Sequence, residues 1–269
     1  MRFLLPLLSL VFFACGSTED NSSSIVLDAT PADSGVPDAQ FTCNEVTYRA
    51  EGGGPFTCPA PPESMTINDR GREFEIFKYE ASHPLATNLW AFPCSTVRGE
   101  KYEAPAEPTE ACSRPGFVPW HSVRWDDAKA ACETIGWRLC SRDELVRACQ
   151  GPDGTRFTFG AEFRGGACNV RDAYRDATGT SSTVAPTGEF DDCVSTEGIN
   201  DLTGNLWEWS NERDESDAAT RYYHGAGWKT IAERHRDTDQ ACTVENRVPG
   251  FSARVFLKEY VGFRCCRNL

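Results

Sequence analysis

Positive charge is scarce in this sequence. The chain of 269 residues carries 27 Lys and Arg against 40 Asp and Glu, for a formal net charge of −13. Because a negative surface repels phosphate backbones, nucleic acid is not expected as a partner. Histidine is also scarce, with four residues, and no Cys-x-x-Cys pair occurs, so zinc staples built on such pairs are not expected. No Ser-His-Asp arrangement or phosphate-binding loop stands out.

The chain also lacks an apolar run long enough to span a bilayer. The run 3–13 follows the single charge of Arg2 and is too short for a transmembrane helix, which is typical of a secretion signal. We assign residues 1–14 to a lipoprotein signal peptide, because a small residue before Cys15 resembles the bacterial lipobox in which the cysteine receives a lipid. Ordinary secretion with cleavage near Cys15 is the alternative. Both place the protein outside the cytoplasm, and a lipid would anchor it to a bacterial membrane, by default the outer membrane.

No Lys or Arg follows until the folded part of the chain. Residues 15–42 are rich in Ser, Asp, Ala, Thr and Pro, so they cannot bury enough surface to fold, and we expect a disordered acidic tether. Residues 43–269 show no internal repeat. Hydrophobic residues make up 40% of the chain, which is enough for the core of one globular domain.

Cysteine, in contrast, is plentiful. The sequence has 13 cysteines, and setting Cys15 aside leaves twelve. Thiols at this density persist as disulfides only in an oxidising compartment, and an even number allows six bridges with no free thiol. We therefore expect a disulfide-stapled, extracytoplasmic domain.

Two helices and several short strands are predicted. Apolar residues fall on one helical face over 125–135, and a second helix begins at Ser141, which forms a capping box with Glu144. Short aromatic and β-branched runs at 74–79 and 206–209 favour strands joined by long loops. The fold class is therefore α+β with little regular secondary structure, in which disulfides and bound ions replace part of a regular core.

Several motifs stand in a fixed order from near Phe77 to the C-terminus. They are Phe77–Ser82, Trp125–Cys132 with Gly136–Leu145, Phe157–Gly160, Ala167–Asn169, Asp201–Trp209, Gly225–Trp228 and Gly262–Cys265. In this order they resemble the motifs of the sulfatase-modifying-factor, or formylglycine-generating enzyme, family. The resemblance implies a C-type-lectin-like α+β fold and, for active members, copper-dependent oxidation of a protein cysteine to formylglycine.

The resemblance also implies disulfide pairs. A cysteine of the first helix is expected to join the terminal Gly-Phe-Arg-Cys strand, and such a long loop would stabilise the fold by about 4–5 kcal/mol in the chain-entropy model. The cysteine of the second helix, Cys149, is likewise expected to join Cys242, and the remaining four pairs are inferred between neighbours. The expected bridges are Cys132 with Cys265, Cys149 with Cys242, Cys140 with Cys266, Cys168 with Cys193, Cys94 with Cys112, and Cys43 with Cys58.

A candidate calcium-binding loop lies within the Asp201–Trp209 motif. Asp201 and Glu208 place two carboxylates around a Gly-Asn turn, and calcium prefers hard carboxylate and carbonyl oxygens. The alternative is a hairpin turn at Gly204-Asn205, with Glu208 solvated or paired to an arginine.

The resemblance assigns calcium ligands at two places. In the first, the ligands would be the side chains of Asp201 and Glu208 with the carbonyls of Gly204 and Leu206. A second site would begin at Asn169 and the carbonyl of Val170, with Asp176 as a loosely aligned further ligand.

The cysteine pair on which the family's oxidase chemistry depends is missing. The family's first cysteine lies two residues beyond a Gly-Gly-Ser-Tyr/Trp motif and the second five further on, where this chain has Thr230 and His235. Soft Cu(I) needs thiolates, so copper and formylglycine-generating activity are not expected. An enzyme with altered metal chemistry at His224 and His235 is the alternative, although two histidines fall short of the three or four ligands that metals require.

Four residues are expected to line the groove that relatives use for substrate peptide. They are Trp207, Trp228, His224 and Arg264, of which Trp207 and Arg264 fit core and ion-pair roles equally well. The sequence therefore favours a lipid-anchored, non-catalytic binding or accessory module for a peptide, protein or glycan.

Overall fold

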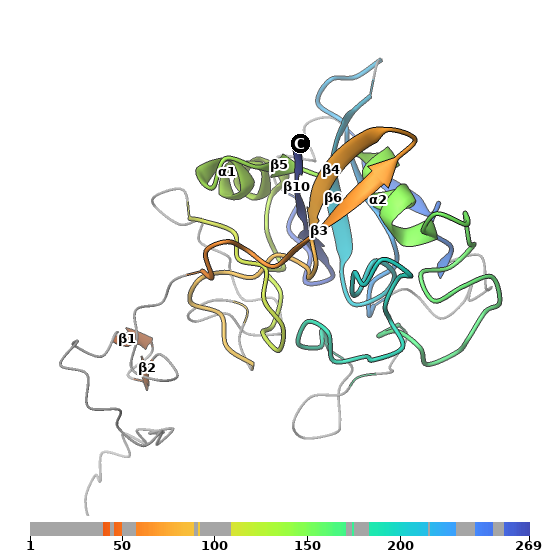
Figure 1. Cartoon of the computed structure of the whole chain (residues 1–269). Coiled ribbons are helices and arrows are strands. Elements are labelled where there is room, and N and C mark those ends of the chain that lie inside the picture. Colours follow the sequence, from red (N-terminus) through yellow and green to blue (C-terminus); the bar gives the residue numbers. More distant parts are fainter. Residues whose placement is uncertain are drawn as a thin grey trace, which may run out of the picture.

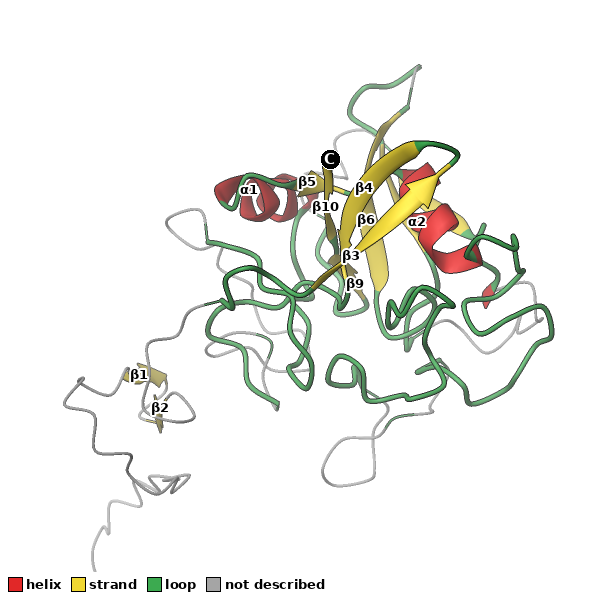
Figure 2. Cartoon of the chain, viewed as in Figure 1, coloured by secondary structure: helices red, strands yellow, loops and turns green. Residues whose placement is uncertain are grey.

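Among the residues that it describes, the computed structural model has ten short strands and two helices, joined by long loops (Figures 1 and 2). It describes residues 40–43, 46–49, 58–88, 91, 109–170, 174, 183–214, 216–229, 240–249 and 256–269. The first two strands, β1 (Gln40–Cys43) and β2 (Val46–Arg49), pair antiparallel as a separate two-stranded sheet. The first described strand thus begins at Gln40, three residues before the expected domain start at Cys43.

The first four-stranded sheet has the order β3-β4-β10-β5 and is antiparallel throughout. Its strands are β3 (Ser64–Asp69), β4 (Arg72–Phe77), β5 (Arg138–Leu139) and β10 (Cys265–Asn268). β4 overlaps the strand expected at 74–79 but begins and ends two residues earlier. The last strand of the chain lies between β4 and β5, so the C-terminus closes the sheet.

The second sheet has the order β8-β7-β6-β9. Its strands are β6 (Trp207–Arg213), β7 (Arg221–His224), β8 (Glu245–Val248) and β9 (Val261–Phe263). β6 pairs antiparallel with β7 and parallel with β9, and the register between β6 and β7 shifts between Trp209 and Arg213. β6 continues the strand expected at 206–209, so the Gly204-Asn205 turn leads into this strand and is not a hairpin tip.

The two helices lie at opposite sides of the first sheet (Figure 1). Helix α1 (Trp125–Thr134) buries the expected apolar face, and Gly136, with φ 75°, follows its end. Helix α2 (Arg142–Gln150) begins at Ser141, whose side chain accepts the N–H of Glu144 while the Glu144 carboxylate accepts the N–H of Ser141. The predicted capping box is therefore present. In the described part of the chain, neither helix has the length and apolar character that a membrane crossing requires.

Two adjacent cysteines in β10 connect the two halves of the core. Successive strand residues point to opposite faces, so Cys265 belongs to the core cluster under α1 and Cys266 to the cluster under α2. Cys265 is bonded to Cys132 of α1, and Cys266 is bonded to Cys140 before α2. One strand thus holds both helices by covalent bonds on opposite faces.

Five disulfides are present among the described residues, and four are the expected pairs. These four are Cys132–Cys265, Cys140–Cys266, Cys149–Cys242 and Cys168–Cys193. The fifth joins Cys58 to Cys112, with a Cα–Cα distance of 4.9 Å. The expected bridges Cys94–Cys112 and Cys43–Cys58 are therefore wrong.

The segment that precedes β3 explains this correction. The N–H of Cys58 donates to the Glu110 side chain, and the N–H of Glu63 donates to the carbonyl of Ser113. These bonds hold 58–63 against 110–113, so that Cys58 meets Cys112. Cys94 lies outside the described residues.

Candidate functional site

The loop between Asp201 and β6 has an unusual backbone. Asp201, Gly204 and Asn205 have φ angles of 58°, 87° and 51°, in the left-handed region. Gly204 also has no room for a side chain, since a Cβ there would lie 3.0 Å from the carbonyl oxygen of Asn169. The close approach brings the two expected calcium sites, at Asn169 and at Asp201–Glu208, side by side.

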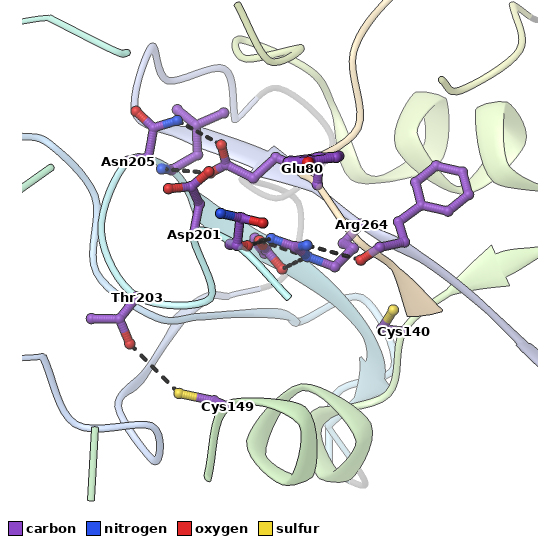
Figure 3. Close-up of polar contacts among 12 residues, drawn as sticks. Glu80, Cys140, Cys149, Asp201, Thr203, Asn205 and Arg264 are labelled. Carbon is purple, nitrogen blue, oxygen red and sulfur yellow. Dashed lines mark hydrogen bonds and ion pairs between the residues drawn. The ribbon is translucent and has the colours of Figure 1, made fainter. Parts of the chain in front are cut away.

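Asn205 connects this loop to its surroundings through its side chain. Its Nδ2 donates to Glu80 Oε2 (2.6 Å) and to the carbonyl of Ala185, and its Oδ1 accepts from Asn169 Nδ2 (3.0 Å) and from the Ala185 N–H. The other Glu80 oxygen accepts the N–H of Leu206 (2.9 Å). Glu80 thus holds the start of β6 in place, and Figure 3 shows it above the Asp201 loop.

Asn169 uses its side chain for structure. Its Nδ2 also donates to the carbonyl of Thr183, and its Oδ1 accepts the N–H of Tyr174. The Asn169 carbonyl accepts the N–H of Asn205. Each of its two oxygens accepts one hydrogen bond, as each oxygen of Glu80 does, and Asp176 lies outside the described residues, so the second calcium site stays a prediction.

Glu208 pairs with the buried guanidinium of Arg264. Arg264 is 0% exposed and donates to both Glu208 oxygens, at 2.9 and 3.1 Å to Oε1 and 3.3 Å to Oε2. Its remaining N–H groups donate to the carbonyls of Phe77, Lys78 and Asn200. The pairing of Glu208 with an arginine was the alternative to a calcium role, and Figure 3 shows Arg264 beside Asp201.

Three buried carboxylates therefore share one buried cation. Burial, followed by the charges of Asp201 and Glu208, raises the pKa of Glu80 well above its ordinary value. Burial raises the pKa of Asp201 to about 6, against the opposing effects of the Gly188 N–H, which donates to Asp201 Oδ2, and of Arg264. Hence the cluster carries more negative charge than Arg264 neutralises whenever Glu80 and Asp201 ionise.

This donor set suits a hard cation in part. The oxygens of Asp201 and Glu80 are the type that calcium prefers, and a cation would offset their uncompensated charge. Glu208, however, is committed to Arg264. Within the described residues, no three His, Cys, Asp or Glu side chains are arranged to hold a metal. A calcium ion here would therefore rely on Asp201, Glu80 and backbone carbonyls.

Within the described residues, the side chains expected to line a groove are buried. Trp207 and Trp228 are each 8% exposed. Trp207 packs edge-on against Tyr223 at 5.3 Å, and Trp228 Nε1 donates to the carbonyl of Glu259. Arg264 is fully buried, and its N–H groups donate to Glu208 and to backbone carbonyls. The groove prediction is therefore wrong for these side chains in the part of the chain described.

His224 is also buried, with 3% exposure. Its Nε2 lies 3.2 Å from Ser210 Oγ, while its Nδ1 has no hydrogen-bond partner among the described residues. Burial lowers its pKa to about 4, so the ring is neutral at pH 7. The proposed metal partner, His235, and Thr230 lie outside the described residues.

The fold and the motif order define the class of protein. Residues 40–269 match the family described as the sulfatase-modifying factor enzyme 1-like domain, and the chain belongs to this family. Its architecture is the family's C-type-lectin-like α+β fold, stapled by disulfides.

The chain is similar to a curated protein and to solved structures. The chain is 26% identical over 192 residues to inactive C-alpha-formylglycine-generating enzyme 2 of Bos taurus, covering 69% of this chain and 61% of that protein. The match thus spans about three fifths of the relative's length. Among solved structures, the chain resembles PvdO of Pseudomonas aeruginosa, with 17% identity, 77% and 90% coverage of the two chains and a TM-score of 0.50, and CarF, with 14% identity, 73% and 87% coverage and a TM-score of 0.49.

Glu80 is the site residue that the sequence reasoning missed. It lies in the Phe77–Ser82 motif, which was used only as a marker of the family. A single glutamate between apolar residues shows no spacing relation to Asp201, more than a hundred positions later. Only the tertiary contact with Asn205 and Leu206 reveals its place in the cluster.

Proposed function

We propose that this protein is a non-catalytic, extracytoplasmic binding or accessory module that has lost formylglycine-generating activity. The observation that carries the proposal is the state of its sulfur atoms. All ten cysteines with a described structural role are in disulfides, so none of them supplies a thiolate for copper. The two positions where relatives carry the copper-binding cysteines hold Thr230 and His235.

The name of the curated relative agrees with this proposal. The Bos taurus protein is named as an inactive formylglycine-generating enzyme, although the similarity is 26%. A family member that has lost its catalytic activity still has the disulfide-bonded fold, and the loops of this fold can bind a ligand. We propose a peptide, protein or glycan as the ligand, and no nucleic acid, because the chain is strongly acidic.

The disulfides also support the proposed location. Five bridges in a domain of this size are typical of an oxidising compartment. Residues 1–39 lie outside the described part, so the signal peptide and the lipid on Cys15 rest on the sequence alone. We propose a lipid anchor to a bacterial membrane, with the acidic segment as a spacer.

Calcium is proposed as a structural ion. Asp201 and Glu80 are buried carboxylates with raised pKa values, and Arg264 neutralises only one negative charge of the cluster. A divalent cation would offset the remaining charge and would accept the Gly204 and Leu206 carbonyls as further ligands. Copper is not part of the proposal.

A direct assay tests the loss of activity. The purified full chain is incubated with Cu(I), oxygen and a Cys-x-Pro-x-Arg peptide, and mass spectrometry follows the peptide cysteine. We expect no conversion to formylglycine, while an active formylglycine-generating enzyme in the same buffer converts the peptide. Conversion by this chain would overturn the proposal, and it would favour the alternative of an oxidase with altered ligands near His224 and His235.

A second measurement tests whether the cysteines are in disulfides. Thiol titration of the unfolded, unreduced chain should find no pair of reactive thiols, because the described bridges use ten cysteines and we propose that Cys43 and Cys94, which remain besides Cys15, are also oxidised. Two reactive thiols would contradict the sulfur argument even if the peptide assay were negative.

A further inference from the structure

The disulfide Cys168–Cys193 lies against the candidate calcium-binding loop, at residues 201–205. Both cysteines are 0% exposed, and they are 25 positions apart in the sequence. The proposed function assigns this disulfide no role. Its contacts with the loop come from both of its ends.

Cys193 contacts the first part of the loop. Its backbone carbonyl accepts the N–H of Asp201 at 3.0 Å, and its Sγ lies 3.1 Å from the carbonyl oxygen of Thr203. Cys193 therefore contacts the loop backbone on both sides of Leu202.

The Cys168 end of the disulfide contacts the Gly204-Asn205 turn. A Cβ on Gly204 would lie 3.0 Å from Cys168 Cβ and 3.0 Å from the carbonyl oxygen of Asn169, so the turn packs directly on residues 168–169. The same carbonyl accepts the N–H of Asn205 at 2.7 Å. One disulfide thus joins the two segments that contact the beginning and the end of the 201–205 loop.

The loop needs this support because two of its residues have an unfavourable backbone conformation. Asp201 and Asn205 are not glycines, yet their φ angles are 58° and 51°. Such a conformation costs free energy and persists only where the surroundings enforce it. Here the enforcing hydrogen bonds come from Cys193 and Asn169, and the disulfide links these two positions covalently. The direction of the Asp201 side chain and of the Gly204 carbonyl depends on the same backbone conformation.

We propose that the Cys168–Cys193 disulfide is a positioning element that holds the 201–205 loop in the conformation required to bind a hard divalent cation. The inference rests on the proposed calcium role of Asp201 and of the Gly204 and Leu206 carbonyls. Such a cation needs several oxygens at fixed distances at the same time. A loop that adopts the binding conformation for about a tenth of the time binds the ion about tenfold more weakly.

The test compares two double variants of the full chain. Cys168→Ala with Cys193→Ala removes the proposed positioning disulfide. Cys58→Ala with Cys112→Ala is the control, because this disulfide lies where 58–63 meet 110–113. The control disulfide spans 54 positions against 25, so in the chain-entropy model its loss destabilises the fold at least as much. A loss of global stability alone would therefore affect both variants.

Two measurements are made on each protein. Isothermal titration calorimetry with calcium chloride gives the affinity, and we expect binding at least about tenfold weaker without Cys168–Cys193 and within about twofold of wild type in the control. Amide hydrogen exchange in EGTA reports the loop without any ion. The Asn205 amide should exchange at least about tenfold faster only in the first variant, while the Trp207 amide, which donates to the carbonyl of Tyr260 in all three proteins, should stay unchanged.

The possible outcomes separate this inference from the calcium proposal. If wild type binds calcium and the Cys168 and Cys193 variant binds it equally well, or if Asn205 exchange is unchanged, the positioning role is wrong. If wild type binds no calcium, the calcium proposal fails and this inference fails with it. Cys168→Ala with Cys193→Ser, which keeps a hydroxyl near the Thr203 carbonyl, replaces the first variant if that does not fold. Failure of both to fold beside a folded control would show a role in the fold as a whole and would also overturn the proposal.

Discussion

At the scale of single residues, Arg264 is the centre of the candidate site. It was expected to line a groove, but it is buried and forms hydrogen bonds with Glu208 and with three backbone carbonyls. A buried charge is tolerated only when its partners satisfy it. Arg264 therefore joins β4, the Asp201 loop and β6 through one side chain, and the first prediction concerns it.

Arg264→Met should destabilise the protein strongly. The substitution leaves Glu208 as a buried, unpaired charge, and breaking a buried pair from one side costs about 3–5 kcal/mol. Urea denaturation measures the change. Arg72→Met removes an exposed pair with Asp69 and should cost less than about 1 kcal/mol. Equal effects of the two substitutions would contradict the central role of Arg264.

His224 should make the protein sensitive to acid. Burial lowers its folded pKa from the ordinary value of 6.5 to about 4. Between these values the unfolded chain binds a proton that the folded chain does not, so the free energy of unfolding falls as pH drops from 6.5 towards 4. For one proton the slope approaches about 1.4 kcal/mol per pH unit.

The measurement is the difference between wild type and His224→Gln across that pH range. Other buried groups titrate in both proteins and cancel in the difference. We expect the variant to lose less stability than wild type on acidification. Parallel pH profiles would show that folded His224 titrates like an exposed histidine.

At the scale of elements, the cap of α2 gives a local test. Ser141 and Glu144 exchange two hydrogen bonds, and Glu144 also pairs with Arg138 of β5 through both oxygens at 2.7 Å. Ser141→Ala should cost about 1 kcal/mol in urea denaturation. Thr134→Ala is the control, because its hydroxyl only bonds back to Ala130 near the end of α1. A control effect as large as the cap effect would contradict the prediction.

The helices could be predicted because their signals are local. The apolar spacing from Trp125 lies within about three helical turns and the Ser141-Glu144 pair within one, and both helices are present. Cys132–Cys265 and Cys149–Cys242 followed from the resemblance, whereas Cys140–Cys266 and Cys168–Cys193 were inferred between neighbouring cysteines, and all four are present. Cys58–Cys112 was not predicted, because the path of the chain before β3 depends on contacts with 110–113 that no short motif records.

The candidate site was predictable only in part for the same physical reason. The Asp201–Glu208 spacing marked a loop of carboxylates, but a sequence does not show which cation the carboxylates meet. Arg264 reaches Glu208 across 56 positions, and Glu80 reaches Asn205 across 125. Such partners are set by the order of strands in the sheets, so the groove expectation for Arg264 and Trp207 was wrong.

At the scale of the whole molecule, covalent bonds and buried charge act on the same centre. Cys265 and Cys266 directly follow Arg264 in the sequence. They form disulfides with Cys132 in α1 and with Cys140 just before α2, while Arg264 forms a salt bridge with Glu208 of the second sheet. The two sheets and both helices therefore meet within three consecutive residues. Any ligand that neutralises the carboxylate cluster should stabilise the entire fold and not one loop.

Calcium dependence of global stability tests this last step. If calcium binds at Asp201 and Glu80, it should raise the melting temperature, and free calcium at a hundred times its Kd should add about 2.7 kcal/mol to the free energy of unfolding. Calorimetry in calcium and in EGTA measures the shift. Asp201→Asn keeps an oxygen for the Gly188 N–H and tolerates the left-handed backbone, but it removes one charge.

The order of stability of the variant and the wild type should differ between EGTA and calcium. In EGTA at pH 7, Asp201→Asn should be at least as stable as wild type, because one of three crowded carboxylates has become neutral. In calcium, wild type should be the more stable of the two, because the variant has lost a charged ligand. A wild-type melting temperature that is the same in calcium and EGTA would exclude calcium, and the raised pKa values of Glu80 and Asp201 would then mean that protons neutralise the cluster.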